Sequence, residues 1–224
     1  DVPVTTPVDG RALVVAVNVG QPRTLTVGAV EVTTAIWKAP VAGRLQVRRL
    51  NLDGDGQADL RAHGGPDKAV YAYAAESAQW WAGQLGVTAL PPGMFGENLT
   101  TTGLDVDGAV VGEVWRIGTA VLQVRQPRIP CYKLAVRFDD PAMPRRFSGA
   151  GRPGAYLRVL EEGELGAGDA VTVEQRPAHG VTVADVAAAY HGHDVELAAR
   201  LLDVRELTDS WKEWARSRVE HHRA

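Results

Sequence analysis

Residues 120–133 read AVLQVRQPRIPCYK. The first six of them alternate in character, with Gln123 and Arg125 on one face and Leu122 and Val124 on the other, and this period of two predicts a β-strand. A Pro-x-x-Pro turn follows, and proline cannot continue the hydrogen-bond ladder of a strand because it lacks an N–H. The stretch therefore predicts a strand that ends at a rigid turn, with Cys131 directly after it.

Short runs of the same character lie on both sides of this strand, and the chain's 24 glycines and 13 prolines supply the turns between them. These runs cover residues 12–19, 29–35, 44–50, 69–73, 110–117, 156–160 and 170–174. Apolar residues at helical spacing predict a helix over 74–85, and a shorter helix is expected around 134–138. Many short strands with few helices predict a mainly β, α+β fold, namely a closed or nearly closed β-barrel with helical insertions.

The composition changes after residue 177, and the last part of the chain has helix signals only. Thr182 and Asp185 have the spacing of a capping box. A second helix is expected over 196–202, and Thr208 precedes a third over 210–219. We therefore predict a β-barrel domain over residues 1–177 and a three-helix subdomain over 178–224. Trp211 and Trp214 share one face of the third helix, where they pack internally, form a homodimer contact or dock an electron donor.

Charge and apolar content exclude several classes of protein. The 224 residues include 24 basic and 27 acidic side chains, a net charge of −3, whereas nucleic-acid binders usually carry a basic excess. The longest apolar stretch, residues 12–17, is far shorter than the roughly 20 residues that a membrane-spanning helix needs. A single cysteine excludes an internal disulfide and a multi-cysteine metal site. We expect a cytoplasmic protein with no nucleic-acid or membrane partner.

Cys131 is the first candidate for chemistry. Arg125, Arg128 and Lys133 lie within six residues of it. Nearby cations lower the pKa of a thiol, and a thiolate is both a nucleophile and a soft metal ligand. The alternative is a buried and inert cysteine, which is common.

The second candidate is the loop HGGPDK at residues 63–68. Gly64 and Gly65 let backbone N–H groups approach a ligand closely, and such loops bind anions. His63 adds a titratable group at one end and Lys68 a cation at the other. The alternative is a glycine-rich hairpin with two solvated charges.

Two further segments carry single candidates. Glu97, in FGENLT at residues 95–100, is a candidate general acid or pocket acceptor, unless the segment is a surface turn. Arg23 follows the first strand and could meet an anion, unless it belongs to a plain turn. Asp53 and Asp55 have the spacing of a calcium loop, but Ala58 stands where that loop needs glycine, so we exclude a calcium site.

Taken together, these segments resemble the MOSC-domain family, specifically its YiiM-like members. The resemblance runs from about residue 11 to 175, and residues 181–219 resemble the three-helix domain that follows MOSC in those members. Its most specific pieces are the pair QPRIPCYKL and HGGPDK. The other pieces are residues 18–23, 52–59, 96–100, 151–154, 156–163 and 168–169.

The resemblance implies a β-barrel that binds the molybdenum cofactor, a pterin dithiolene that holds an oxo-molybdenum. Cys131 then occupies the position of the protein ligand to molybdenum. The cofactor is anionic, and cationic side chains with backbone N–H groups would balance it. The residues expected to bind it are Arg23, Gly64, Gly65, Lys68, Asn98, Arg125, Arg128 and Lys133, with Arg152 as a weaker candidate.

The family likeness also implies a reductase of N-hydroxylated small molecules, including hydroxylaminopurine base analogues. His63 and Glu97 are then the expected proton donors, unless they only position the pterin. The chain has no flavin or iron–sulfur motif, so a separate electron-donor protein of the flavin reductase type is expected. Three alternatives stay open: a carrier of the cofactor or of sulfur without turnover, an enzyme with Cys131 as nucleophile and His63 as base, and a cysteine redox sensor.

Overall fold

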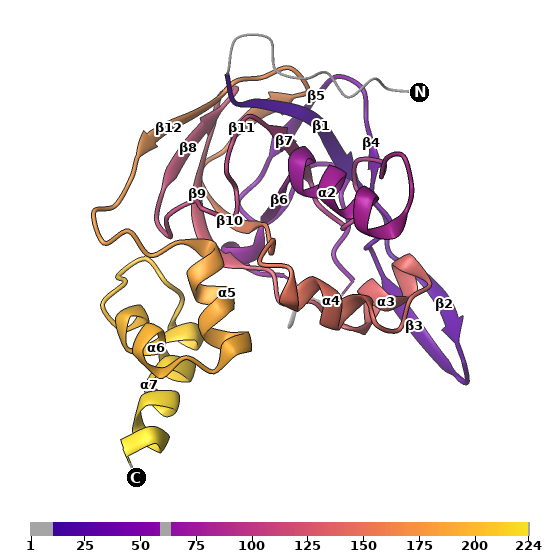
Figure 1. The fold of residues 1–224 in the computed structure, drawn as a ribbon. Helices are drawn as coiled ribbons and strands as arrows, with labels where there is room; N and C mark the ends of the chain where they lie inside the picture. The colour runs from indigo at the N-terminus through magenta and orange to yellow at the C-terminus, as the bar shows by residue number, and fades with distance from the viewer. Residues whose placement is uncertain (1–10, 59–63, 224) are drawn as a thin grey trace.

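The computed structural model describes residues 11–58 and 64–223, and its centre is a mixed sheet of eight strands (Figure 1). The order across the sheet is β12-β8-β9-β10-β6-β7-β1-β4. Neighbours are antiparallel except β6 and β7, which are parallel. The strands are β1 (Leu13–Val19), β4 (Ala39–Pro40), β6 (Val70–Ala74), β7 (Leu99–Thr102), β8 (Val114–Ile117), β9 (Ala120–Pro127), β10 (Ala155–Glu161) and β12 (Val171–Gln175).

The α+β class is confirmed, but the sheet is not closed into a barrel. Strands β12 and β4 end the hydrogen-bonded order. The two ends of β1 have different partners on the same edge. Asn18 pairs with β4, whereas Leu13 forms an isolated bridge with Ala170, next to β12. The Val14 amide also donates to the Asp169 carbonyl at 2.9 Å. The Gly168 and Val171 amides donate to the Val14 and Ala12 carbonyls at 2.8 Å, so the two sides meet over a short stretch without a continuous ladder.

Strand β6 explains why both faces of the sheet are covered. All five of its residues are buried, and side chains alternate between the faces of a strand. Val70 and Ala72 join the main apolar core inside the sheet. Tyr71 and Tyr73 join a separate aromatic cluster on the other face. Strand β6 therefore lies between two hydrophobic cores and contributes side chains to both.

Two hairpins lie apart from this sheet. Strands β2 (Arg23–Val27) and β3 (Val30–Thr34) form an exposed one, and β5 (Arg44–Val47) pairs with β11 (Gly163–Gly166). The sequence patterns predicted β3 and β5 but not β2, β4, β7 or β11. The runs LTTT and GELG of β7 and β11 lack the apolar alternation that marks a half-buried strand, and β4 has only two residues.

Three short helices cover the aromatic face. Helix α2 (Ala75–Leu85) follows β6 directly, as predicted, and ends at Gly86 in the left-handed conformation (φ 69°) that glycine adopts readily. Helix α3 (Tyr132–Phe138) begins directly after Cys131, and α4 (Met143–Gly149) follows it. The short 3₁₀ turn η1 (Pro66–Lys68) precedes β6. These elements set the position of the cysteine and of Lys68.

The end of the chain forms α5 (Val183–Gly192), α6 (Val195–Leu201) and α7 (Asp209–Arg223). The predicted capping box is present: the Asp185 amide donates to Thr182 Oγ1 at 3.1 Å, and the Thr182 amide donates to Asp185 Oδ2 at 2.9 Å. Val186 and Leu201 belong to the same apolar core as the sheet. The division at residue 177 stays a prediction. Within the described residues, no helix has the length and apolarity needed to cross a membrane.

Candidate functional site

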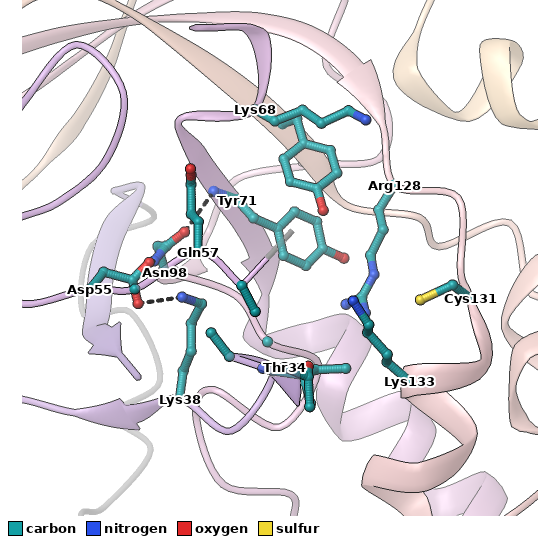
Figure 2. Close-up of a pocket in the computed structure, with 16 residues that line it drawn as sticks. Thr34, Lys38, Asp55, Gln57, Lys68, Tyr71, Asn98, Arg128, Cys131 and Lys133 are labelled. Atoms are coloured by element: carbon teal, nitrogen blue, oxygen red, sulfur yellow. Dashed lines mark hydrogen bonds and ion pairs between the residues drawn. The ribbon is translucent and has the colours of Figure 1, made fainter. Parts of the chain in front are cut away.

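A cavity of about 610 Å³ lies at the end of β9, between the sheet and α3. Its wall combines segments that are far apart in the sequence (Figure 2). The residues that line it are Thr34, Ala35, Ile36, Lys38, Asp55, Gly56, Gln57, Ala58, Lys68, Tyr71, Gly96, Asn98, Arg128, Cys131, Lys133 and Tyr156.

Cys131 stands at the junction of strand and helix. Strand β9 ends at Pro127, and Cys131 keeps an extended backbone (φ −123°, ψ 176°) directly before α3 begins. Its carbonyl accepts from the Leu134 amide at 2.9 Å. In Figure 2 the sulfur points toward the side chains of Arg128 and Lys133. The two prolines of the segment fix this exit from the sheet, because their φ angles are locked.

Arg128 is a buried cation held from several sides. One Nη donates to the Phe95 carbonyl, and the guanidinium lies 5.2 Å from the Tyr71 ring centre and 5.8 Å from that of Phe147. Burial alone would lower the pKa of Arg128, but Tyr71, Tyr156 and Cys131 raise it above its ordinary value. Arg128 is therefore a fixed, permanent positive charge beside the cysteine.

Lys38 and Asp55 form an ion pair on another part of the cavity wall, with side chains only 9% and 2% exposed. Burial lowers the pKa of Lys38, and the Asp55 carboxylate opposes that shift. Asp55 also accepts from the Gly20 amide and from Asn98 Nδ2, both at 2.9 Å. Asp55 thus fastens residues 55–58 to β1 and to the loop before β7.

The lining carries more positive than negative charge. Among the described residues of the lining, Lys38, Lys68, Arg128 and Lys133 are the cationic side chains and Asp55 is the only carboxylate. Low exposure strengthens their field, because water screens buried charges less than exposed ones. The site has the electrostatic character of an anion-binding pocket.

The structure brings together five of the residues predicted from the sequence: Lys68, Asn98, Arg128, Cys131 and Lys133 line the cavity. Both polar atoms of the Asn98 side chain are used in hydrogen bonds within the protein: Oδ1 accepts from the Tyr71 amide at 3.1 Å, and Nδ2 donates to Asp55. His63 lies outside the described residues.

The other predicted residues are not in the cavity lining. Arg23 stacks on Trp37, with its guanidinium carbon 4.4 Å from the ring centre. Arg125 Nε donates to Asp67 Oδ1 at 2.7 Å. Gly64 and Gly65 lie on the chain before η1 and do not reach the wall of the cavity. Their proposed roles toward a cofactor have no support from this geometry.

Glu97 is buried and braces the loop that carries Gly96 and Asn98. Its carboxylate accepts from the Gly93 amide at 2.6 Å, the Phe95 amide at 3.0 Å and Thr100 Oγ1 at 2.9 Å. Burial raises the pKa of Glu97, although these donors oppose the shift. It does not line the cavity, so this geometry gives it a positioning role.

Sequence reasoning missed several residues of the wall. Lys38, Gln57, Tyr71 and Tyr156 come from segments with no chemical motif of their own. The segment at 52–59 was among the pieces of the family resemblance, and it supplies Asp55, Gly56, Gln57 and Ala58 to the wall. Tyr156 begins another of those pieces, residues 156–163, but nothing in its strand pattern marked it as a site residue, and Tyr71 gave no signal in an ordinary apolar strand.

Comparison with known proteins assigns the chain to a family. The MOSC domain model matches residues 59–172, which include η1, β9 and Cys131. The chain belongs to the MOSC-domain family. An uncharacterized protein, YflK of Bacillus subtilis, is 40% identical over 90% of this MOSC chain and 92% of its own length. The crystal structure of YiiM from Geobacillus stearothermophilus superposes with a TM-score of 0.77 at 31% identity, covering 93% of this chain and 99% of that one.

A fungal relative adds a functional description. A protein named "Reductase" from Gibberella moniliformis is 30% identical over 86% of this MOSC chain, which spans only 35% of the fungal protein. The MOSC domain itself takes its name from the C-terminal domain of a molybdenum-cofactor sulfurase. These comparisons show a MOSC-domain protein that is similar to YiiM and to part of a fungal protein named as a reductase.

Proposed function

We propose that this chain is a molybdenum-cofactor-dependent reductase that converts N-hydroxylated small molecules, hydroxylaminopurine bases among them, into amines. The observation that carries the proposal is the Cys131 sulfur at the wall of a cation-lined cavity, pointing toward Arg128 and Lys133. A thiol is the soft ligand that molybdenum chemistry needs, and Cys131 is the only thiol in the chain.

The residues present fit the cofactor in charge. The group is anionic through its phosphate and dithiolene, and the described residues of the wall include four cations and one carboxylate. Arg128 suits phosphate or pterin oxygens because its guanidinium is planar and rigidly held. Cys131 would hold the metal, and Lys68 and Lys133 would balance the charge of the organic part.

The cofactor, when bound, supplies the two-electron chemistry of the reaction. The balance is R–NHOH + 2 e⁻ + 2 H⁺ → R–NH₂ + H₂O: the N–O bond breaks, nitrogen is reduced, and oxygen leaves as water. The chain must supply protons and exclude competing water. Burial raises the pKa of Tyr156, so its hydroxyl stays protonated at neutral pH. Tyr156 lines the cavity, so its hydroxyl can orient the N-hydroxyl group by donating a hydrogen bond, but its raised pKa makes it a poor source of the transferred protons. His63 stays the expected proton donor.

The given residues contain no flavin or iron–sulfur motif, so we propose that the electrons come from a separate donor. The fungal reductase is consistent with this arrangement, since about two thirds of its length has no counterpart in this chain. A flavin reductase is the class of donor we propose.

An assay of the cofactor-loaded protein tests this function. Dithionite-reduced methyl viologen replaces the unknown donor, and 6-N-hydroxylaminopurine is the substrate. We expect conversion to adenine by the wild type and by Tyr132→Phe, an exposed neighbour of the cysteine, and none by Cys131→Ala. Bound cofactor without any reduction would instead identify a carrier, and full activity of Cys131→Ala would refute the ligand assignment.

A further inference from the structure

A second cavity, of about 770 Å³, adjoins the first. Lys68 and Tyr156 line both cavities, so the two share a wall. The remaining residues of the second lining come from β9, the segment after it, and the C-terminal helices: Gln126, Pro127, Ile129, Tyr190, Ser210, Trp211 and Trp214.

Three aromatic rings form one side of this second cavity. The ring centre of Tyr190 lies 5.4 Å from those of both Trp211 and Trp214, and the two indoles are 5.8 Å apart. Trp211 is fixed, because its Nε1 donates to Gln126 Oε1 at 2.8 Å in a buried hydrogen bond. Trp214 is half-buried and presents part of its surface. The wall is therefore a rigid aromatic surface.

The charges of the two cavities differ. Among the described residues, the first is lined by the thiol and four cations, whereas the second has Lys68 as its one charged side chain. An anionic cofactor belongs in the first. An uncharged planar ring suits the second, because aromatic rings stack favourably and the half-buried indole of Trp214 presents part of its surface there, whereas Trp211 is buried.

We infer that the second cavity is the subsite for the planar aromatic part of the substrate. This inference rests on the proposed function. A purine ring held against Trp214 would direct its N-hydroxyl group across the shared wall, past Lys68 and Tyr156, toward Cys131. The C-terminal helices then determine which N-hydroxylated compounds the enzyme accepts.

Two substrates distinguish a subsite for the aromatic ring from a general loss of activity in a variant. 6-N-Hydroxylaminopurine has the aromatic ring, and N-methylhydroxylamine has the reacting group alone. We expect Trp214→Ala to raise KM for the purine about tenfold, because stacking of a base on an aromatic side chain is typically worth that much. The value of kcat/KM for N-methylhydroxylamine and the molybdenum content should not change. Trp214→Phe keeps a ring and should recover most of the affinity.

A binding measurement checks the same site without turnover. Equilibrium dialysis with adenine should show about tenfold weaker binding to Trp214→Ala and to Ser210→Phe, which narrows the cavity, than to the wild type. The matched control is Trp80→Ala. Trp80 is a partly exposed tryptophan of α2 that lines neither cavity.

The outcomes are distinguishable. Equal losses on both substrates, or unchanged adenine binding, would overturn the subsite. Loss of molybdenum from Trp214→Ala would assign the second cavity to the cofactor and also overturn it. If the wild type reduces neither substrate, the proposed function fails, and Trp214-dependent adenine binding still decides whether this cavity takes a planar base.

Discussion

Glu97 illustrates, at the scale of one residue, how a candidate catalytic group can serve another purpose. A carboxylate in a loop before a strand has the chemistry of a general acid. In the structure its two oxygens accept hydrogen bonds from Gly93, Phe95 and Thr100, all within a few residues of chain. The sequence shows the residue type, whereas the direction of the side chain depends on how the loop closes around it.

Glu97→Gln should alter the pH dependence of stability. The amide replaces an acceptor with a donor, so one buried N–H loses its partner, and we expect a cost of about 1–3 kcal/mol. Because the folded pKa of Glu97 is raised, its contribution is fully present below pH 4.5, the ordinary value, and is lost as pH rises through the folded pKa. Chemical denaturation across this range should show the wild-type advantage over the variant decreasing with pH. An advantage that grows with pH would contradict this.

Lys133→Gln tests the role of charge in the cavity. Removing one cation from the wall should weaken retention of the cofactor about tenfold, as expected for a charge-assisted contact. Pterin content after extended dialysis measures it. The matched control is Arg116→Gln, which removes an exposed cation of β8 that lines neither cavity and pairs with Glu174 at 2.5 Å. Equal retention by Lys133→Gln and the wild type would show that this charge does not contribute.

At the scale of elements, the segment from β9 through Cys131 to α3 could be predicted because its signals are local. The alternation of β9, the two prolines and the position of Cys131 are all visible within residues 120–133. The cations Arg128 and Lys133 join the cysteine in the cavity for the same reason. Strands β4, β7 and β11 were missed because their pairing partners, not their own apolar pattern, define them as strands. Strand β2 was missed although it alternates, because its first residue, Arg23, was assigned to a turn.

The turn before β10 offers a test of backbone placement at the site. Gly154 has a left-handed φ of 64°, and a Cβ there would lie 2.7 Å from the Ala72 carbonyl oxygen and 2.8 Å from the Tyr71 ring. Gly151 has a similar φ of 66° with open space around it. Gly151→Ala should cost about 1–2 kcal/mol of unfolding free energy for the conformation alone. Gly154→Ala should lower the free energy of unfolding by about 1–3 kcal/mol more, because its Cβ would also crowd the Ala72 carbonyl oxygen. Denaturant titration of both variants measures this, and equal costs would refute the close approach.

At the scale of the whole molecule, the cavity depends on contacts that join distant parts of the chain. Lys38 meets Asp55, and Tyr71 and Tyr156 come from neighbouring strands far apart in sequence. No local pattern identifies such residues, because their neighbours are determined by strand order. The main apolar core likewise runs from the sheet into α5, α6 and α7.

Trp211→Phe should loosen the contact between α7 and the sheet. Phenylalanine keeps an aromatic ring but cannot donate to Gln126 Oε1, and an unpaired buried acceptor costs about 1–3 kcal/mol. Trp214→Phe is the control, since that indole is half-buried and has no such bond to β9 in the described part of the chain. Thermal unfolding should rank Trp211→Phe below Trp214→Phe. The opposite order would mean that this hydrogen bond does not hold α7 in place.

The most direct test of the central claim is the metal and pterin content of the protein, expressed in a host that makes the molybdenum cofactor, with Cys131→Ala alongside the wild type. We predict near-stoichiometric molybdenum and pterin in the wild type and loss of the molybdenum in the variant, while circular dichroism shows the same fold for both. Molybdenum retained by Cys131→Ala would contradict the ligand assignment. Its absence from both proteins, in a host whose cofactor supply is verified, would contradict the claim that this cavity holds the cofactor.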